Sequence, residues 1–452
     1  MTRFPKKSVY VETYGCQMNI SDGELMEGIL VNEGYEVSSS PDEADVIIVN
    51  TCAIREHAEE RVLGRVGQLY GLKKERPEVI LGVTGCMAQR LGEVLLKRAP
   101  YVDLVMGPDA YRSLPEQLNK IQRGAKSTPS RSSKKRGPQL AVLDLSVEEN
   151  YEGLTQRRTS PVSAWVPIQR GCNHRCTFCI VPYVRGPEKN RKSSEVLREI
   201  EEIVESGRTE VTLLGQTVNS YQSEGISFHE LLRSVARIPG IRRVRFTSPH
   251  PNDVTPELLE VMAEEPNICE QLHLPVQSGN DKVLRRMLRR YTVETFLDKV
   301  QLARDLIPDL SLSTDIIVAF PGETKVQFED TLGLLRRVRF DDAYTYKYSL
   351  RDGTPATRLP QEDFLSEDEA QNRLAKLIEV HRGIQSEINK TEVGRTEEVL
   401  VEKRGRKKGQ VLGRTRRNKV VAFVAPADTI GGYQRVLLTS TTGATFVGEL
   451  AN

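Results

Sequence analysis

The sequence contains no apolar run near the roughly 18 residues that a membrane-spanning helix requires. Its start, MTRFPKKSVYVETYG, enters a strand-like pattern without the apolar core of a signal peptide. It has no strong excess of one charge, because 64 basic residues face 62 acidic ones. Glycine and proline, 33 and 23 of 452 residues, are too few for a collagen-like or disordered chain. We therefore expect a soluble, cytoplasmic, monomeric multidomain protein with no membrane partner.

Strand-like runs at residues 9–15, 46–51 and 79–85 alternate with helical patterns. Strands at this spacing form parallel sheets, because a crossover helix fits between them. The pattern predicts an α/β, doubly wound domain over residues 1–121. The first seventeen residues of the stretch that follows contain six basic residues, no acidic residue and one alkyl side chain. Such a composition cannot bury enough to order itself, so we predict a basic flexible linker and connector over residues 122–157.

The remaining chain divides into two further domains. Six strand-like runs, each followed by a helical pattern, predict a partial (β/α)6 barrel over residues 158–387. A full barrel would need two more strands than this stretch contains. Residues 388–452 hold five short strand candidates separated by Gly, Asn or Pro, which predict a small all-β barrel.

Three of the seven cysteines, Cys16, Cys52 and Cys86, are far apart in the sequence but share one context. Each directly follows a predicted parallel strand, and parallel strands bring their carboxyl ends to one edge of a sheet. The three thiols should therefore meet. Three buried structural cysteines are the alternative, but three equivalent positions make coincidence a poor explanation. Soft thiolates on irregular loops suit zinc or an iron-sulfur cluster.

A second trio, Cys172, Cys176 and Cys179, forms a C-x3-C-x2-C array after the first barrel strand. Zinc sites usually pair C-x2-C units with a fourth ligand, and redox dithiols need only two sulfurs. Three thiolates can hold three irons of a four-iron cluster and leave the fourth iron open to substrate or cofactor. The array's place at the carboxyl end of a barrel strand agrees, because barrel active sites are built there.

The array, with an aromatic residue before its last cysteine, resembles the radical S-adenosylmethionine (radical SAM) enzymes. With ETYGCQMN, VNTCAIREHAEERV, TGCMAQR and the β-rich tail, the chain resembles the methylthiotransferase family over essentially its whole length. The resemblance implies two 4Fe-4S clusters. One would lie on Cys172, Cys176 and Cys179 and bind S-adenosyl-L-methionine. The auxiliary cluster would lie on Cys16, Cys52 and Cys86 and carry the sulfur to be inserted.

Within the family, LLGQTVNSY, HLPVQSGN, DGTPA and GRTRRNKVVAF are most similar to the members that modify tRNA. The resemblance implies methylthiolation of carbon 2 of the isopentenylated adenosine next to the anticodon. One S-adenosylmethionine would donate the methyl group and another would supply the radical, with an external electron donor and sulfur source. Two alternatives within the class are threonylcarbamoyl-adenosine in tRNA and a ribosomal-protein aspartate. A non-catalytic iron-sulfur RNA-binding sensor is the alternative from another class.

Other residues carry weaker signals. Gln216, Ser278 and Asp315 stand at or just beyond predicted strand ends, where they could bind S-adenosylmethionine or cap the next helix. Ala319 stands where the family usually has glycine, next to the expected adenosine site. Cys269 is expected to be a buried free thiol. The tail resembles the TRAM RNA-binding module, which implies that its basic stripe binds RNA phosphates. The basic residues of that stripe are Lys403, Arg404, Arg406, Lys407, Lys408, Arg414, Arg416, Arg417 and Lys419.

Overall fold

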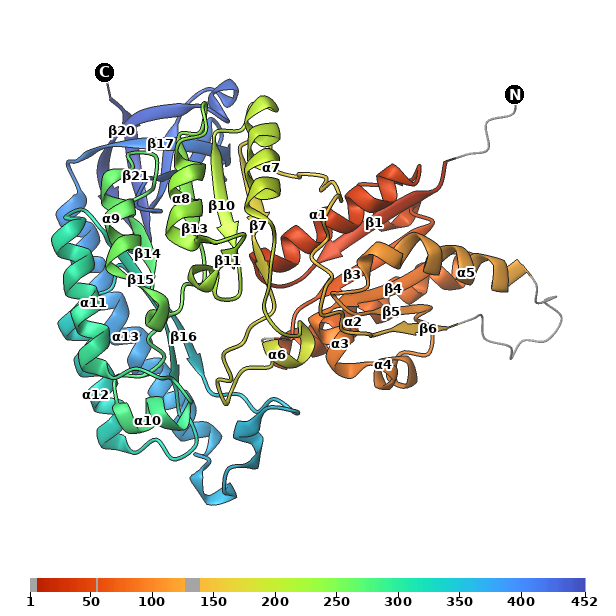
Figure 1. The fold of residues 1–452 in the computed structure, drawn as a ribbon, viewed down its shortest axis with the longest axis horizontal. Coiled ribbons are helices and arrows are strands. Elements are labelled where there is room, and N and C mark those ends of the chain that lie inside the picture. Colours follow the sequence, from red (N-terminus) through yellow and green to blue (C-terminus); the bar gives the residue numbers. More distant parts are fainter. Residues whose placement is uncertain (1–5, 54–55, 127–138, 452) are drawn as a thin grey trace. The chain divides into compact units, whose positions relative to one another are not determined.

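The computed structural model describes residues 6–53, 56–126 and 139–451, which fall into two compact units. The first unit holds the described part of residues 1–159 together with residues 169–175 and 179–189. The second holds residues 160–168, 176–178 and everything from residue 190 onward. Figure 1 labels most of the elements of both units.

The first unit is built on a parallel sheet in the order β2-β1-β3-β4-β5-β6. Its strands are β1 (Ser8–Thr13), β2 (Glu36–Val37), β3 (Val46–Thr51), β4 (Ile80–Gly85), β5 (Leu104–Met106) and β6 (Leu140–Val142). The central strands β3 and β4 are buried along their whole length, because helices cover both faces. The predicted doubly wound sheet is confirmed.

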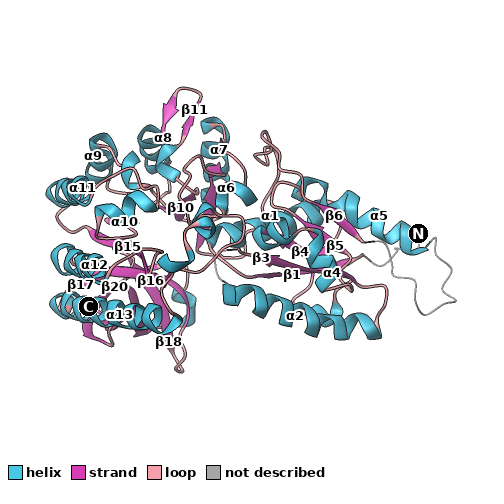
Figure 2. Ribbon diagram, turned by 90° about the horizontal axis from the view of Figure 1, so that it is seen from below, coloured by secondary structure: helices cyan, strands magenta, loops and turns pink. Residues whose placement is uncertain are grey.

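Two apolar cores lie on the two faces of this sheet. One core includes side chains of α1 (Gln17–Asn32) and α5 (Leu114–Lys126). The other includes side chains of α2 (Glu56–Glu75), α3 (Cys86–Leu91) and α4 (Glu93–Arg98). Figure 2 shows α1 and α2 on opposite sides of the strands. The loops after β1, β3 and β4 emerge at one edge of the sheet, because these strands are parallel.

The predicted boundary after residue 121 and the linker over residues 122–157 need correction. Helix α5 continues to Lys126, and β6 pairs in parallel with β5 as the last strand of the sheet. Leu154 packs on the core below α1 and α5, and Tyr151 stacks on Tyr111. The average composition of the segment concealed this short apolar strand, because two partly buried side chains, Leu140 and Val142, are enough to pack it on the core. The predicted linker residues 127–138 lie outside the described residues.

The second unit contains the six predicted barrel strands in chain order. They form two parallel three-stranded sheets, β13-β10-β7 and β14-β15-β16. An isolated parallel bridge connects Val244 of the third strand, β13, with Ile268, which lies just before the fourth strand, β14. The strands are β7 (Ser163–Pro167), β10 (Glu210–Leu214), β13 (Arg243–Phe246), β14 (Gln271–His273), β15 (Ser311–Val318) and β16 (Asp342–Lys347). The partial (β/α)6 barrel is confirmed.

Amphipathic helices cover the outside of these strands and share one large apolar core with them. They are α7 (Ser193–Glu205), α8 (Phe228–Ala236), α9 (Pro256–Glu264), α11 (Val293–Leu306), α12 (Lys325–Val338) and α13 (Glu367–Glu392). Shorter elements complete the description: β8 (Gln169–Arg170), α6 (Val181–Val184), β9 (Lys189–Asn190), β11 (Gln222–Ser223), β12 (Ile226–Ser227) and α10 (Asp281–Arg286). Helix α13 passes without a break through the predicted domain boundary at residue 387.

The tail forms the predicted five-stranded closed barrel, in the order β17-β18-β19-β21-β20. Its strands are β17 (Thr396–Arg404), β18 (Gln410–Thr415), β19 (Val420–Val424), β20 (Tyr433–Thr441) and β21 (Thr445–Leu450). Arg243 and Arg245 on β13 attach it to the partial barrel. Both guanidinium groups are buried, and they donate to backbone carbonyls of residues 398 and 414–416 at 2.7–2.8 Å.

Within the described ranges, every helix is too short or too polar to cross a membrane.

Candidate active site

The structure brings together the first cysteine trio at the carboxyl edge of the first sheet. Cys16 is the N-cap of α1, Cys52 follows β3, and Cys86 begins α3 directly after β4. A hydrogen bond from Cys52 and the nearby Arg185 charge lower the pKa of Cys16 to about 6, against the effect of burial. Burial raises the pKa of Cys86. The three sulfurs therefore share one electrostatic environment, as the positions after the strands predicted.

The backbone directly before Cys86 is packed so closely that there is no room for a side chain at position 85. Gly85 has φ +94°, and a Cβ there would lie 2.3 Å from the carbonyl oxygen of Thr51. Asn19 is fully buried, and its amide donates to the same carbonyl at 3.1 Å while its Oδ1 accepts from the backbone N–H of Cys16. Soft sulfur donors held on rigid backbone suit an iron-sulfur cluster.

A buried network of charged side chains, which the sequence did not indicate, contacts one sulfur of the trio. Arg185 donates from Nε to the Cys86 sulfur at 3.2 Å and from Nη2 to Asp22 at 2.6 Å. The other Asp22 oxygen accepts from Arg170 at 2.9 Å, and that guanidinium lies 4.6 Å from the Tyr151 ring centre. Each of the three charged side chains is at most 4% exposed. The available signal was an aspartate among the buried positions of α1.

The C-x3-C-x2-C array begins within a tight backbone contact. Gly171 has φ +75°, and a Cβ there would lie 1.9 Å from the carbonyl oxygen of Pro187, so only glycine fits. The next residue, Cys172, donates its backbone N–H to Gly186 at 3.2 Å. Cys179 is partly exposed. Ile180, directly after it, packs with Cys86 and Ala53 in one apolar cluster of the first unit. The last cysteine of one trio therefore adjoins residues that pack on the other trio.

The middle of the array, residues 176–178, is fixed to the second unit. Cys176 is 7% exposed, and its sulfur accepts from Arg289 Nη1 at 3.4 Å. Thr177 exchanges backbone hydrogen bonds with Met287 and Ala356, and Phe178 packs on the same two residues. The aromatic residue before the last cysteine thus anchors the array in an apolar core.

The three predicted S-adenosylmethionine contacts have different environments. Gln216 follows β10, and among the described residues its buried Oε1 has no hydrogen-bond partner, so it can accept from a ligand. Asp315 on β15 lies 3.5 Å from His273 Nε2 and stays partly exposed. Ser278 is fully buried, and its hydroxyl bonds the backbone N–H of Asn280 and faces Thr331. Asn280 rather than Ser278 is the N-cap of α10, and the contact of Ser278 with S-adenosylmethionine stays a prediction.

Sequence reasoning missed Gln277, which precedes Ser278. Its backbone pairs with β15 beside Asp315, its φ is +70°, and its buried Oε1 also has no partner among the described residues. A strained backbone around an open acceptor is typical of ligand sites. The signal was present in the sequence, because Gln277 is the first polar residue after the end of β14.

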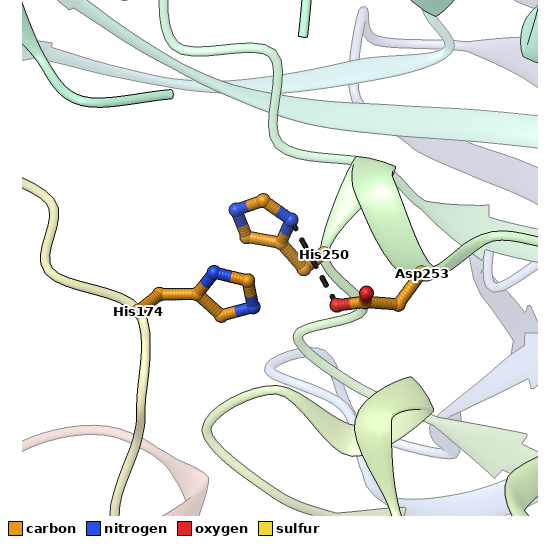
Figure 3. A group of neighbouring side chains, drawn as sticks. All are labelled: His174, His250 and Asp253. Atoms are coloured by element: carbon orange, nitrogen blue, oxygen red, sulfur yellow. Dashed lines mark ion pairs between the residues drawn. The ribbon is translucent and has the colours of Figure 1, made fainter. Parts of the chain in front are cut away.

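The histidines next to these strands make structural contacts. His250 accepts from the backbone N–H of Asn252 at 3.2 Å and lies 4.0 Å from Asp253, as Figure 3 shows for the pair. His273 bonds the Ser313 hydroxyl at 3.0 Å besides its contact with Asp315. Cys269 is 2% exposed, in agreement with the predicted buried thiol.

Ala319 occupies the left-handed backbone region, with φ +57°. Its N–H donates to Glu323 Oε2 at 2.7 Å, a bond that glycine would also make. The left-handed conformation costs a non-glycine residue roughly 1–2 kcal/mol. This explains physically why a glycine is usual at the position in the family that the chain resembles.

We expect Ala319→Gly to raise the free energy of unfolding by about 0.5–1 kcal/mol, because relief of strain outweighs the extra freedom of glycine in the unfolded chain. Denaturant unfolding followed by circular dichroism measures the change. Ala303→Gly in the interior of α11 is the control and should lower stability by about 1 kcal/mol or more. A loss of stability in both variants would contradict the strain argument.

The nine basic residues of the tail divide into two groups. Arg416 pairs with Glu270 at 2.8 Å, Arg417 pairs with Glu392 and Glu397, and Lys419 contacts Asp341 at 2.8 Å. Arg414 lies 3.2 Å from Glu402. These four side chains are engaged within the protein, so their charges are largely neutralised. The exposed group stands at the hairpin between β17 and β18 and consists of Lys403, Arg404, Arg406, Lys407 and Lys408.

A cavity of about 360 Å³ lies at the amino ends of β15 and β16, away from the cysteine array. Its lining includes Arg395 and Arg417, which pair with Asp309 and Glu392. Because these charges are already matched within the protein, we assign no ligand to it.

Three family models match the chain in order along the sequence. Residues 8–107 match the uncharacterized protein family UPF0004, residues 166–335 match the Radical SAM superfamily, and residues 390–450 match the TRAM domain. The matched ranges correspond to the parallel sheet, the partial barrel and the closed β-barrel.

Solved structures support the fold. A radical S-adenosylmethionine methyltransferase, TsrM from Kitasatospora setae, has a TM-score of 0.55 and 14% identity and covers 78% of this chain and 77% of its own. The cobalamin-dependent S-adenosylmethionine radical enzyme OxsB has a TM-score of 0.54, 14% identity and coverage of 83% and 56%. At this identity the likeness concerns the fold alone.

Curated relatives match nearly the whole chain. Proteins named tRNA-2-methylthio-N(6)-dimethylallyladenosine synthase from Chloroherpeton thalassium and Carboxydothermus hydrogenoformans are each 43% identical to it. The first alignment covers 98% of this chain and 96% of the relative, and the second covers 96% and 97%. A relative of the same name from Clostridium botulinum is 42% identical over 97% of this chain and 96% of its own. This chain therefore belongs to the tRNA-2-methylthio-N(6)-dimethylallyladenosine synthase family.

Proposed function

We propose that the protein is a radical SAM enzyme that adds a methylthio group to carbon 2 of isopentenylated adenosine next to the anticodon of tRNA. The observation that carries the proposal is the pair of cysteine trios in a chain more than 40% identical to synthases of that name. An aromatic C–H is too weakly acidic for a general base, so the reaction needs a cofactor that removes hydrogen as a radical.

Each trio would hold one 4Fe-4S cluster, Cys172, Cys176 and Cys179 the radical SAM cluster and Cys16, Cys52 and Cys86 the auxiliary one. When bound, the first cluster supplies the electron that cleaves S-adenosylmethionine. The chain's own part is to hold the ligands. Gln216, Gln277 and Asp315 offer oxygen acceptors at strand ends for the amino group and hydroxyls of S-adenosylmethionine, and the buried open acceptors of the two glutamines support that assignment.

The remaining assignments concern partners. An external donor would supply the electrons and a separate source the sulfur, because six of the seven cysteines serve as ligands in this scheme and the seventh, Cys269, is buried. We also propose that the protein works as a monomer in the cytoplasm, where tRNA is modified.

The exposed basic hairpin of residues 403–408 would bind the tRNA backbone. Lysine and arginine that contact phosphates add affinity with little sequence preference. The basic side chains of residues 403–408 are exposed on an all-β scaffold, whereas those of residues 414–419 are engaged within the protein. This difference supports residues 403–408 as the RNA-binding surface.

We expect a variant with Lys403, Arg404, Arg406, Lys407 and Lys408 all changed to Gln to bind tRNA about tenfold more weakly or worse at physiological salt. Its plot of log affinity against log salt should flatten by about 0.7–0.9 for each phosphate that the variant no longer neutralises. Filter binding over a salt series measures both. The control removes two exposed charges from α13, Lys376→Gln with Arg382→Gln, and should bind normally. Equal binding by both variants would place the RNA surface elsewhere.

The function is tested with three substrates presented to the anaerobically reconstituted enzyme. They are an anticodon stem-loop with isopentenyladenosine, the same RNA with threonylcarbamoyl-adenosine, and a ribosomal-protein peptide with an aspartate. Mass spectrometry should find the methylthio product in the first alone. Product from either of the others would move the protein to that branch of the family. RNA binding without any cleavage of S-adenosylmethionine would favour the sensor alternative.

A further inference from the structure

Each cysteine trio has one buried arginine that donates a hydrogen bond to one of its sulfurs. At the first trio Arg185 Nε lies 3.2 Å from Cys86 Sγ, and at the second Arg289 Nη1 lies 3.4 Å from Cys176 Sγ. Both arginines are at most 7% exposed. Water therefore screens neither charge effectively.

Both guanidinium groups are held in place by other bonds. Arg185 is fixed by Asp22, which also binds Arg170, so the three charges sum to one positive charge. Arg289 is fixed by neutral oxygens, because it donates to the Pro275 carbonyl and to the Tyr291 hydroxyl, both at 3.0 Å. Each trio therefore has one net buried positive charge beside one of its sulfurs.

We propose that Arg185 and Arg289 are positioning residues that raise the reduction potentials of the auxiliary and radical SAM clusters, respectively. This inference rests on the cluster assignments of the proposed function. Reduction adds one electron to a cluster and no proton, and the added negative charge is shared by the ligand sulfurs. A fixed positive donor to a sulfur stabilises the reduced form more than the oxidised form. The external electron donor can then be a weaker reductant.

Each substitution by glutamine removes one buried positive charge from beside one cluster. Arg289→Gln should lower the ratio of reduced to oxidised radical SAM cluster about tenfold at a fixed potential, which is about 59 mV for one electron. Arg185→Gln should shift only the auxiliary cluster, by a similar factor, because it also removes one buried positive charge while Asp22 and Arg170 stay in place. Lysine at either position keeps the charge and should recover part of the shift.

The experiment is a redox titration of the reconstituted full-length protein, with each cluster followed by electron paramagnetic resonance and iron counted in every sample. Variants that lack one trio assign the two signals. Arg65→Gln and Arg242→Gln are controls, because these arginines pair with Glu12 and Glu398 rather than with cysteine. Potentials of the Arg185 and Arg289 variants within the spread of these controls would overturn the inference.

Iron content separates this inference from the proposed function. A wild type with about four irons would refute the two-cluster assignment, while the titration would still test the arginine at the remaining cluster. If the glutamine and lysine variants both lose a cluster that the controls keep, the arginine holds the cluster rather than tunes it. That result would overturn the inference and leave the cluster assignment intact.

Discussion

Replacing Cys172, Cys176 and Cys179 together by alanine is expected to abolish cleavage of S-adenosylmethionine. Iron should fall from about eight to about four atoms per chain, because one four-iron cluster is lost and the other keeps its ligands. The structure supports independent loss, since residues 176–178 are anchored by Met287 and Ala356 while the first trio is supported by the first sheet. Anaerobic reconstitution, iron and sulfide analysis and detection of 5′-deoxyadenosine provide the measurements.

The reciprocal variant sharpens this test. Alanine at Cys16, Cys52 and Cys86 should also leave about four irons but should keep the cleavage of S-adenosylmethionine and lose methylthio transfer. Cys269→Ala removes a buried cysteine outside both trios and should keep all the iron and both activities. Cleavage by the first variant, or iron loss in the Cys269 control, would refute the division of the six cysteines into two sites.

Removing Asp22 should cause the largest loss of stability of any single substitution near the site. Its carboxylate is fully buried and binds both Arg170 and Arg185, so alanine would leave two buried guanidinium groups without their shared counter-ion. Breaking a buried pair in this way costs about 3–5 kcal/mol. We therefore expect Asp22→Ala to lower the unfolding midpoint strongly and to expose the amides of α1 to hydrogen exchange.

A neighbouring ion pair on the same helix provides the control. Glu27 pairs with Arg157, whose side chain is 48% exposed, so water can hydrate the guanidinium when the carboxylate is removed. Glu27→Ala should cost about 1 kcal/mol or less. If Asp22→Ala lowers stability no more than Glu27→Ala does, the buried network contributes little to stability. Packing, rather than the ion pair with Asp22, must then hold Arg185 in place.

Local sequence patterns were sufficient to group the six cysteines that we propose as cluster ligands. Cys16, Cys52 and Cys86 each follow a strand whose apolar run is visible in the sequence, and parallel topology then places strand ends together. The second array is local, so its spacing needs no tertiary information. The same logic failed for β6, since Leu140–Val142 is a short run inside a polar segment and becomes a strand only by pairing with β5.

What the sequence by itself determined was therefore the order of domains, the family and the two groups of cysteines, all of which depend on neighbours along the chain. Only the tertiary structure decided which charges act on those sulfurs. Arg170 and Arg185 meet Asp22 across 148 and 163 residues, and Arg289 reaches Cys176 across 113. It also showed that Arg416, Arg417 and Lys419 are engaged in internal contacts. A charged residue has the same appearance in a sequence whether its partner is phosphate, water or a buried carboxylate, because the pairing depends on contacts that folding creates.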